Sequence, residues 1–133
     1  MDALEAARAW AEAWGRAWRT HDPDLVGTLY AQDASFRSQA FRGLEDPAGY
    51  ARWAFEDEAE VECRFSEPRL AAGDGAVVEY WATSTGRDGT VETIAGVALV
   101  RFAADGRVVD ERDYWNTVEG RVDPYEGWDP HRS

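Results

Sequence analysis

The chain has 133 residues, which predicts one domain with a single hydrophobic core. Its 26 acidic and 14 basic residues give a formal charge of -12, which argues against nucleic acid and anionic membrane surfaces as partners. The single cysteine, Cys63, excludes a disulfide framework and a cysteine-based zinc site. The apolar run 94–100 is too short to span a bilayer, and the acidic N-terminus shows no secretory signal. We therefore expect a cytoplasmic protein without a metal or another cofactor.

The first half of the chain carries helix signals. Apolar residues, several of them tryptophans, recur at the 3.6-residue period from the N-terminus, and charged residues occupy the opposite arc. Two Asp-Pro pairs, at Asp22 and Asp46, are typical of helix starts because aspartate caps and proline suits the first turn. The predicted elements are helices over 2–20, 23–30 and 46–58, with a short strand over 34–41 between the last two.

From residue 61 the hydrophobic period changes to two, which predicts four strands. The links between them each carry an Asp-Gly or Gly-Asp-Gly turn signal, and Pro68 indicates a bulge or a sheet edge. Helices followed by an antiparallel meander predict an α+β fold. Residues 118–133 are expected to be a tail that packs on the domain formed by 1–117. The predicted strands are 61–72, 76–85, 90–102 and 108–117.

Several stretches, in their order along the chain, resemble the NTF2-like superfamily, and in particular its SnoaL-like (polyketide cyclase-like) branch of small bacterial proteins. They are His21-Asp22-Pro23-Asp24-Leu25, the segment 29–36, the turn Phe41-Arg42-Gly43, and the segment 105–115 with its Arg112-Asp113-Tyr114-Trp115 run. The resemblance implies three N-terminal helices packed in a strongly curved, mostly antiparallel sheet, which together form a cone around a ligand cavity. Isomerases, cyclases, hydrolases and non-catalytic binders share this fold, so the resemblance alone does not select a reaction.

Hairpin geometry predicts which side chains share a face of the sheet. A two-residue turn at Asp88-Gly89 opposes Tyr80 to Val97, and a three-residue loop at 104–106 opposes Val97 to Asp113. A slip of one residue would exchange the two faces. One face then holds Tyr80, Val97, Leu99, Glu111, Asp113 and Trp115, and the other holds Trp81, Val100, Phe102 and Tyr114.

The resemblance assigns the first face to the cavity, because in similar epoxide hydrolases the aspartate of an Arg-Asp-Tyr-aromatic run points into the pocket. Desolvation there would raise the pKa of Asp113, so that it could act as a general base or acid, with Glu111 sharing the proton. The alternative is an ordinary buried carboxylate. The remaining catalytic residues of epoxide hydrolases and ketosteroid isomerases have no counterparts at the matching positions.

The predicted function is therefore acid–base catalysis of the isomerase, cyclase or hydrolase type on a small hydrophobic substrate; the alternative is a non-catalytic binder or sensor of an apolar ligand. The predicted substrate-binding walls are Trp14, Tyr30, Phe36, Trp53, Tyr80, Val97, Leu99 and Trp115, each of which could equally be plain core. The uncovered face with Trp81, Val100, Phe102 and Tyr114 predicts a homodimer. The acidic run 56–60 is expected to be a solvated helix end.

Overall fold

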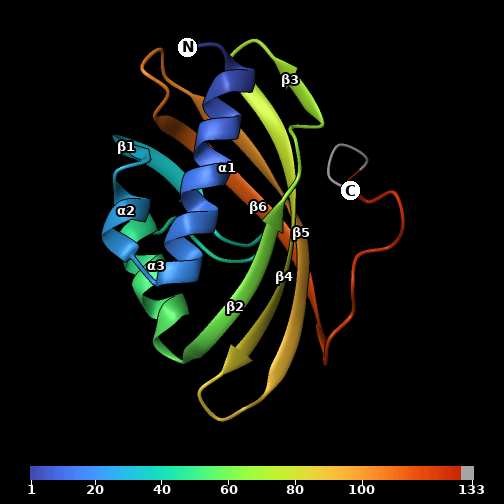
Figure 1. The fold of residues 1–133 in the computed structure, drawn as a ribbon. Coiled ribbons are helices and arrows are strands. Elements are labelled where there is room, and N and C mark those ends of the chain that lie inside the picture. Colours follow the sequence, from blue (N-terminus) through green and yellow to red (C-terminus); the bar gives the residue numbers. More distant parts are fainter. Residues whose placement is uncertain (130–133) are drawn as a thin grey trace.

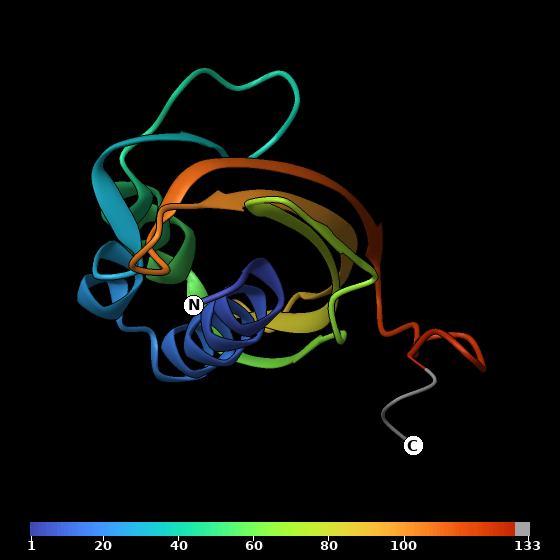
Figure 2. The same cartoon turned by 90° about the horizontal axis from the view of Figure 1, so that it is seen from above.

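The computed structural model describes residues 1–129 and confirms an α+β arrangement, in which three helices lie on the concave side of a curled sheet (Figure 1). Seen from above, the sheet curves around the first helix (Figure 2). The elements are α1 (Ala3–Thr20), α2 (Pro23–Gly27), β1 (Tyr30–Arg37), α3 (Pro47–Glu56), β2 (Glu58–Phe65), β3 (Leu70–Ala72), β4 (Gly75–Gly86), β5 (Val91–Phe102) and β6 (Val108–Glu119).

Aspartates begin all three helices by accepting a hydrogen bond from a backbone N–H of the first turn. Asp2 caps α1, Asp22 caps α2 and Asp46 caps α3, with oxygen–nitrogen distances of 2.8, 3.1 and 2.8 Å. Proline follows the second and third caps, as the sequence predicts. The helix α2 ends three residues earlier than expected, so Tyr30 opens strand β1 instead of closing a helix.

The sheet has the strand order β1-β6-β5-β4-β2, and β3 also pairs with β4. Strands β2 to β6 pair antiparallel, whereas β1 lies parallel to β6. The strand predicted over 61–72 is split in two around Pro68, which has no N–H for the ladder. On either side of the proline, the N–H groups of Ser66 and Arg69 still bond to carbonyls of β4.

The pairing of β4 with β5 corrects the predicted facing of β5. Tyr80 pairs with Gly96 instead of Val97, because the hairpin loop has three residues, 87–89, and not two. Gly89 adopts φ +85°, a conformation that suits glycine at the end of such a loop. The prediction that Val97 and Leu99 line the cavity is therefore wrong. Both lie on the outer face, where Leu99 is 40% exposed.

A β-bulge between β5 and β6 makes a second one-residue shift. Phe102 pairs with Val108, but Val100 pairs with Glu111, so β6 contributes one extra residue. The longer loop and the bulge each shift the pairing by one residue, so their effects on the facing of β6 cancel. The side chains of Glu111, Asp113 and Trp115 therefore face inward, as predicted from the sequence. Val100 and Phe102 also face inward and are buried in the core, so their predicted place in a dimer surface is wrong.

The chain after β6 folds back over the outer face of the sheet, on the side away from the helices (Figure 2). Trp81 donates a hydrogen bond from Nε1 to the carbonyl oxygen of Val122, and its ring packs edge-on against Tyr125 and Trp128. Trp128 is buried. The rest of the predicted tail, residues 130–133, lies outside the described residues. Within residues 1–129, none of the helices has the length and apolar character needed to cross a membrane.

Candidate functional site

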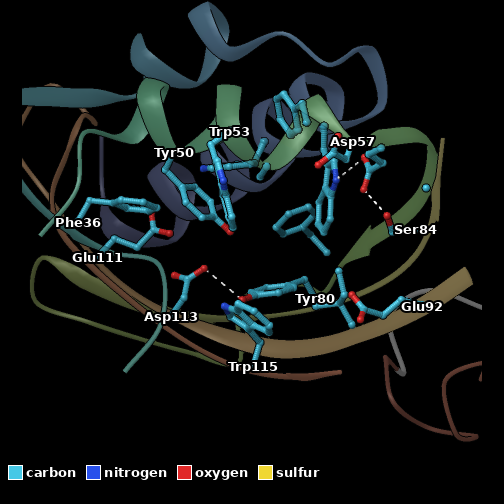
Figure 3. Close-up of a pocket in the computed structure, with 18 of the residues that line it drawn as sticks. Phe36, Tyr50, Trp53, Asp57, Tyr80, Ser84, Glu92, Glu111, Asp113 and Trp115 are labelled. Atoms are coloured by element: carbon cyan, nitrogen blue, oxygen red, sulfur yellow. Dashed lines mark hydrogen bonds between the residues drawn. The ribbon is translucent and has the colours of Figure 1, made fainter. Parts of the chain in front are cut away.

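A cavity of about 350 Å³ lies between the helices and the inner face of the sheet (Figure 3). Its size is at the lower end of the range of roughly 300–1,000 Å³ that is usual for small-molecule sites. Aromatic rings form most of its wall, and polar groups gather at its two ends. The lining residues are Trp10, Trp14, Trp18, Phe36, Tyr50, Trp53, Ala54, Phe55, Asp57, Glu58, Phe65, Tyr80, Ser84, Gly86, Glu92, Ile94, Glu111, Asp113 and Trp115.

One polar end is built around Glu111, which is 1% exposed. Tyr30 donates a hydrogen bond from its hydroxyl to Glu111 Oε1, with an oxygen–oxygen distance of 2.5 Å. The same hydroxyl accepts a hydrogen bond from Trp14 Nε1 at 2.8 Å and a longer one from Trp10 Nε1 at 3.5 Å. Glu111 is therefore tied through one tyrosine to helix α1.

Asp113 lies two residues further along β6 and faces the same cavity (Figure 3). Tyr80 donates a hydrogen bond to its Oδ2 over 3.1 Å. Its other oxygen, Oδ1, is buried and has no hydrogen-bond partner among the described residues. A buried carboxylate oxygen without a donor is costly, so the arrangement favours a proton on the carboxyl pair or a donor supplied by a ligand.

Burial is the main cause of the raised pKa of Asp113, and the charge of Glu111 and the hydrogen bond to it raise the pKa further. Burial also raises the pKa of Glu111, although hydrogen bonds from Asp113 and Tyr30 work against this rise. Two neighbouring carboxyls in this state share one proton more readily than they both ionise. Burial likewise raises the pKa of Tyr30, Tyr50 and Tyr80, so these phenols stay protonated.

The other polar end is built around Glu58 and was missed in the sequence. Glu58 begins β2, is 7% exposed and accepts hydrogen bonds from Trp18 Nε1 at 3.0 Å and from Ser84. Its Oε1 lies 2.8 Å from His21 Nε2. The expectation of a solvated position is wrong for this residue, because the helix ends at Glu56 and the new strand turns Glu58 inward.

His21 reaches Glu58 because it ends helix α1 in the left-handed region, with φ 53°. Its ring stacks on Phe55, with centroids 5.2 Å apart. The sequence places His21 at a helix end but carries no signal that pairs it with a residue 37 positions later. Only the packing of α1 against β2 brings the two together.

The predicted wall residues divide into three groups. Trp14, Phe36, Trp53, Tyr80 and Trp115 line the cavity, Tyr30 lies behind Glu111, and Val97 and Leu99 lie outside. Sequence reasoning missed several lining residues, among them Trp10, Tyr50 and Phe65. Periodicity marks these rings as buried but cannot separate a ring that faces a cavity from a ring that fills a core.

Trp53 lies on α3 and remains 59% exposed, so it stands where the cavity meets solvent. The guanidinium of Arg42 lies 4.8 Å from the centre of its ring. Arg42 also bonds to both carboxylate oxygens of Glu45, and Ser38 donates to the same carboxylate. The loop before α3 is thereby fixed to this edge of the cavity.

Trp115 is held by a hydrogen bond from its Nε1 to the carbonyl oxygen of Ser38, 2.6 Å long. Gly96 lies beside it in the neighbouring strand. A Cβ atom at position 96 would come within 2.5 Å of the Cβ of Trp115. Glycine is therefore required for the close approach of the two strands at this point.

The polar groups of the site do not form a metal centre. Within residues 1–129, no group of three or more histidine, cysteine, aspartate or glutamate side chains could hold a metal ion. Among the lining residues that the structure describes, none is a lysine or an arginine. Proton transfer and hydrogen bonding are the chemistry that these side chains can supply.

The fold has many solved relatives. A Δ5-3-ketosteroid isomerase from Mycobacterium sp. superposes with a TM-score of 0.70 at 16% identity, over 86% of this chain and 98% of that chain. SalBIII, an epoxide hydrolase/cyclase-like enzyme in pyran ring formation, gives a TM-score of 0.71 at 16% identity, over 90% and 100%. A computationally designed 17-OHP binder gives 0.70 at 18% identity, over 88% and 98%. At these identities the likeness shows the fold alone.

Among curated proteins, none matches this sequence. The model of the SnoaL-like domain matches residues 8–111, which is most of the chain. The NTF2-like architecture of the solved relatives agrees with this match. The protein belongs to the family of SnoaL-like domains.

Proposed function

We propose that the protein catalyses proton transfer on a small hydrophobic molecule, with Asp113 as the general base or acid and Glu111 as its partner. The observation that carries the proposal is the pair of buried carboxyls on β6, whose pKa values are both raised and which both line an aromatic cavity. A carboxyl with a raised pKa is matched to proton transfer near neutral pH. Perturbed acids of this kind cluster at functional sites.

Each neighbouring group has a part in this mechanism. Tyr80 orients the carboxyl of Asp113 through Oδ2, and Asp113 exchanges the proton with the substrate. Glu111, held by Tyr30, takes the negative charge when Asp113 carries the shared proton. The rings of the wall bury the apolar part of the substrate and exclude water, which strengthens the electrostatic interactions inside the cavity.

The test is exchange of an acidic C–H proton for deuterium. We expect the wild-type protein to accelerate exchange at C1 of 2-tetralone in D2O, followed by NMR. Asp113→Asn should slow this exchange by about 100-fold or more, the usual range for loss of a general base. Asp105→Asn is the matched control, since it makes the same charge change at an exposed position of the loop before β6. Equal exchange rates in the two variants would contradict the proposal.

The second candidate function is a non-catalytic binder of an apolar ligand. The designed 17-OHP binder supports it, because that protein uses the same fold for binding. This function requires binding of a hydrophobic ligand without exchange or turnover, and an affinity that tolerates Asp113→Asn. Titration of the wild-type protein and of Asp113→Asn with the same hydrophobic ligand separates the two functions.

A homodimer through the outer face remains a proposal, now limited to Trp81 and Tyr114 of the four residues expected. Tyr114 and Leu99 are 43% and 40% exposed on that face, which supports a contact there. The rings of Tyr125 and Trp128 already cover part of Trp81. Sedimentation at micromolar concentration tests the proposal, and a monomer would contradict it.

A further inference from the structure

We propose that the ligand of the cavity carries a protonated amine, which binds at the end formed by Glu58, and that the cavity rejects carboxylates and phosphates. The inference shares one assumption with the proposed function, namely that a ligand binds in this cavity. It concerns the end away from Asp113 and Glu111, so it assigns a binding group and not a reacting group.

The first argument is the charge of the lining. Five lining side chains are acidic: Asp57, Glu58, Glu92, Glu111 and Asp113. No described lining residue is a lysine or an arginine that would offset them. Figure 3 shows Asp57, Ser84 and Glu92 around the end of the cavity opposite Glu111. An anionic ligand would meet like charge at both ends, where the low dielectric makes the repulsion stronger than in water.

The second argument is the set of partners of Glu58. A buried carboxylate is usually paired with a cation or with several donors. The partners of the Glu58 carboxylate are Trp18 and Ser84, which are neutral, and His21, which is cationic only when protonated. An ionised carboxylate offers about four acceptor positions, so these three partners leave room for one more donor. An ammonium group has the charge and the donors to take this position.

The third argument is the aromatic wall next to Glu58. Trp18 and Phe55 both line this part of the cavity. Trp18 donates from Nε1 to Glu58, and the ring of Phe55 stacks on His21. Aromatic faces attract cations, most strongly indole faces that are shielded from water. A hydrophobic amine therefore gains from the carboxylate and from the rings at the same time, whereas an alcohol gains only a hydrogen bond.

The nearby arginines do not cancel this preference. Arg87 bonds through its Nε to the backbone carbonyl of Glu56, and Arg42 pairs with Glu45 outside the ring of Trp53. Neither lines the cavity. The formal charge of -12 also raises the local concentration of cationic ligands around the protein.

The test compares three ligands with one skeleton: 4-phenylbutylamine, 4-phenylbutanol and 4-phenylbutyrate. Binding at pH 7 is measured by titration calorimetry in low and in moderate salt. We expect the amine to bind at least tenfold more tightly than the alcohol in both salts, and the carboxylate to bind most weakly. A carboxylate that binds as tightly as the amine would overturn the proposal, as would an alcohol that does so.

The variant Glu58→Gln should remove the advantage of the amine over the alcohol, measured as the ratio of the two affinities for that variant. Glu60→Gln is the matched control, because it makes the same charge change at an exposed position of the same strand. An amine preference that survives in Glu58→Gln would overturn the assignment of the site. The indole N–H resonance of Trp18 in the wild-type protein gives the same answer without a variant: it should shift with the amine more than that of Trp115.

The outcomes separate this inference from the proposed function. Loss of proton exchange in Asp113→Asn with an intact amine preference supports both. An amine preference without any proton exchange supports the binding site and contradicts the catalytic role. Proton exchange that depends on Asp113, together with equal binding of amine and alcohol, contradicts the amine site alone.

Discussion

The hydroxyl of Tyr30 joins Glu111 to helix α1. It donates to Glu111 Oε1 at 2.5 Å and accepts from Trp14 Nε1 at 2.8 Å. These three residues come from the first helix, the first strand and the last strand, so one buried hydroxyl connects elements at opposite ends of the chain. The same contact holds one carboxyl of the candidate site in place.

Removal of this hydroxyl should reduce stability. In Tyr30→Phe the carboxyl of Glu111 loses its donor and the indole of Trp14 loses its acceptor, both in a buried place. Unsatisfied buried groups cost about 1–3 kcal/mol each, so we expect the free energy of unfolding to fall by at least that amount. Urea denaturation measures the change. Tyr125→Phe, at a ring that is 64% exposed, is the control and should be near neutral.

Stability should fall as the pH rises above about 4, the ordinary pKa of a carboxyl group. The folded protein raises the pKa of Asp113 and of Glu111, so above pH 4 it holds protons that the unfolded chain has released. Stability from such groups is complete below their unfolded pKa and is lost as the pH passes through the folded pKa, by up to about 1.4 kcal/mol per pH unit for each proton.

The measurement is urea denaturation between pH 5 and 8. The wild-type free energy of unfolding should decrease across this range, and Asp113→Asn should flatten the decrease. Carboxyls with lowered pKa values, such as Glu45, have the opposite effect but only below about pH 4.5, outside this window. A wild-type slope that Asp113→Asn leaves unchanged would contradict a proton shared by the two carboxyls.

Gly96→Ala should be strongly destabilising. Its Cβ would lie 2.5 Å from the Cβ of Trp115 and 2.7 Å from the carbonyl oxygen of Tyr114, so the two strands must move apart. Overpacking of this kind costs about 1–3 kcal/mol or more. Gly43→Ala is the control, because a Cβ there meets nothing within 4 Å. Thermal unfolding of both variants, with the indole fluorescence as a second readout, checks the prediction.

Trp53→Ala should affect binding more than stability. The ring is 59% exposed, and changes at such positions usually alter stability by well under 1 kcal/mol. Loss of an aromatic contact should weaken binding of 4-phenylbutanol by roughly tenfold. Calorimetry gives the affinity, and Phe41→Ala, which is 97% exposed and not part of the cavity, serves as the comparison. Equal affinities for the two variants would place the ligand away from α3.

Local signals in the sequence were enough to predict the order of the elements. Asp22 and Asp46 cap the helices that they are expected to start, and the alternation after residue 61 corresponds to strands. The facing of β5 could not be predicted, because it depends on one residue of loop length at 87–89 and on one bulge before Glu111. Each feature involves a single residue, and a shift of one residue moves the side chains of a strand to the opposite face of the sheet.

The two carboxyls of the site were predicted together because one strand carries both. Glu111, Asp113 and Trp115 lie on β6, and their common facing follows from their spacing by two residues. Glu58 and His21 lie 37 positions apart and meet only through packing of α1 on β2. The run of acidic residues around Glu58 predicts a position exposed to solvent. No local pattern shows that the helix ends before Glu58 and that the following strand turns this carboxylate inward.

The bulge in β6 has a consequence for how the length of this chain can vary. Val108 and Glu111 both point to the interior although three positions separate them, since the bulge absorbs one residue. Deletion of Val109 would straighten the ribbon and keep Asp113 inside. Deletion of Arg112 would turn Asp113 to the outside. Loss of one residue is thus tolerated at the bulge, upstream of the carboxyls, whereas loss of one residue between them changes which of them faces the cavity.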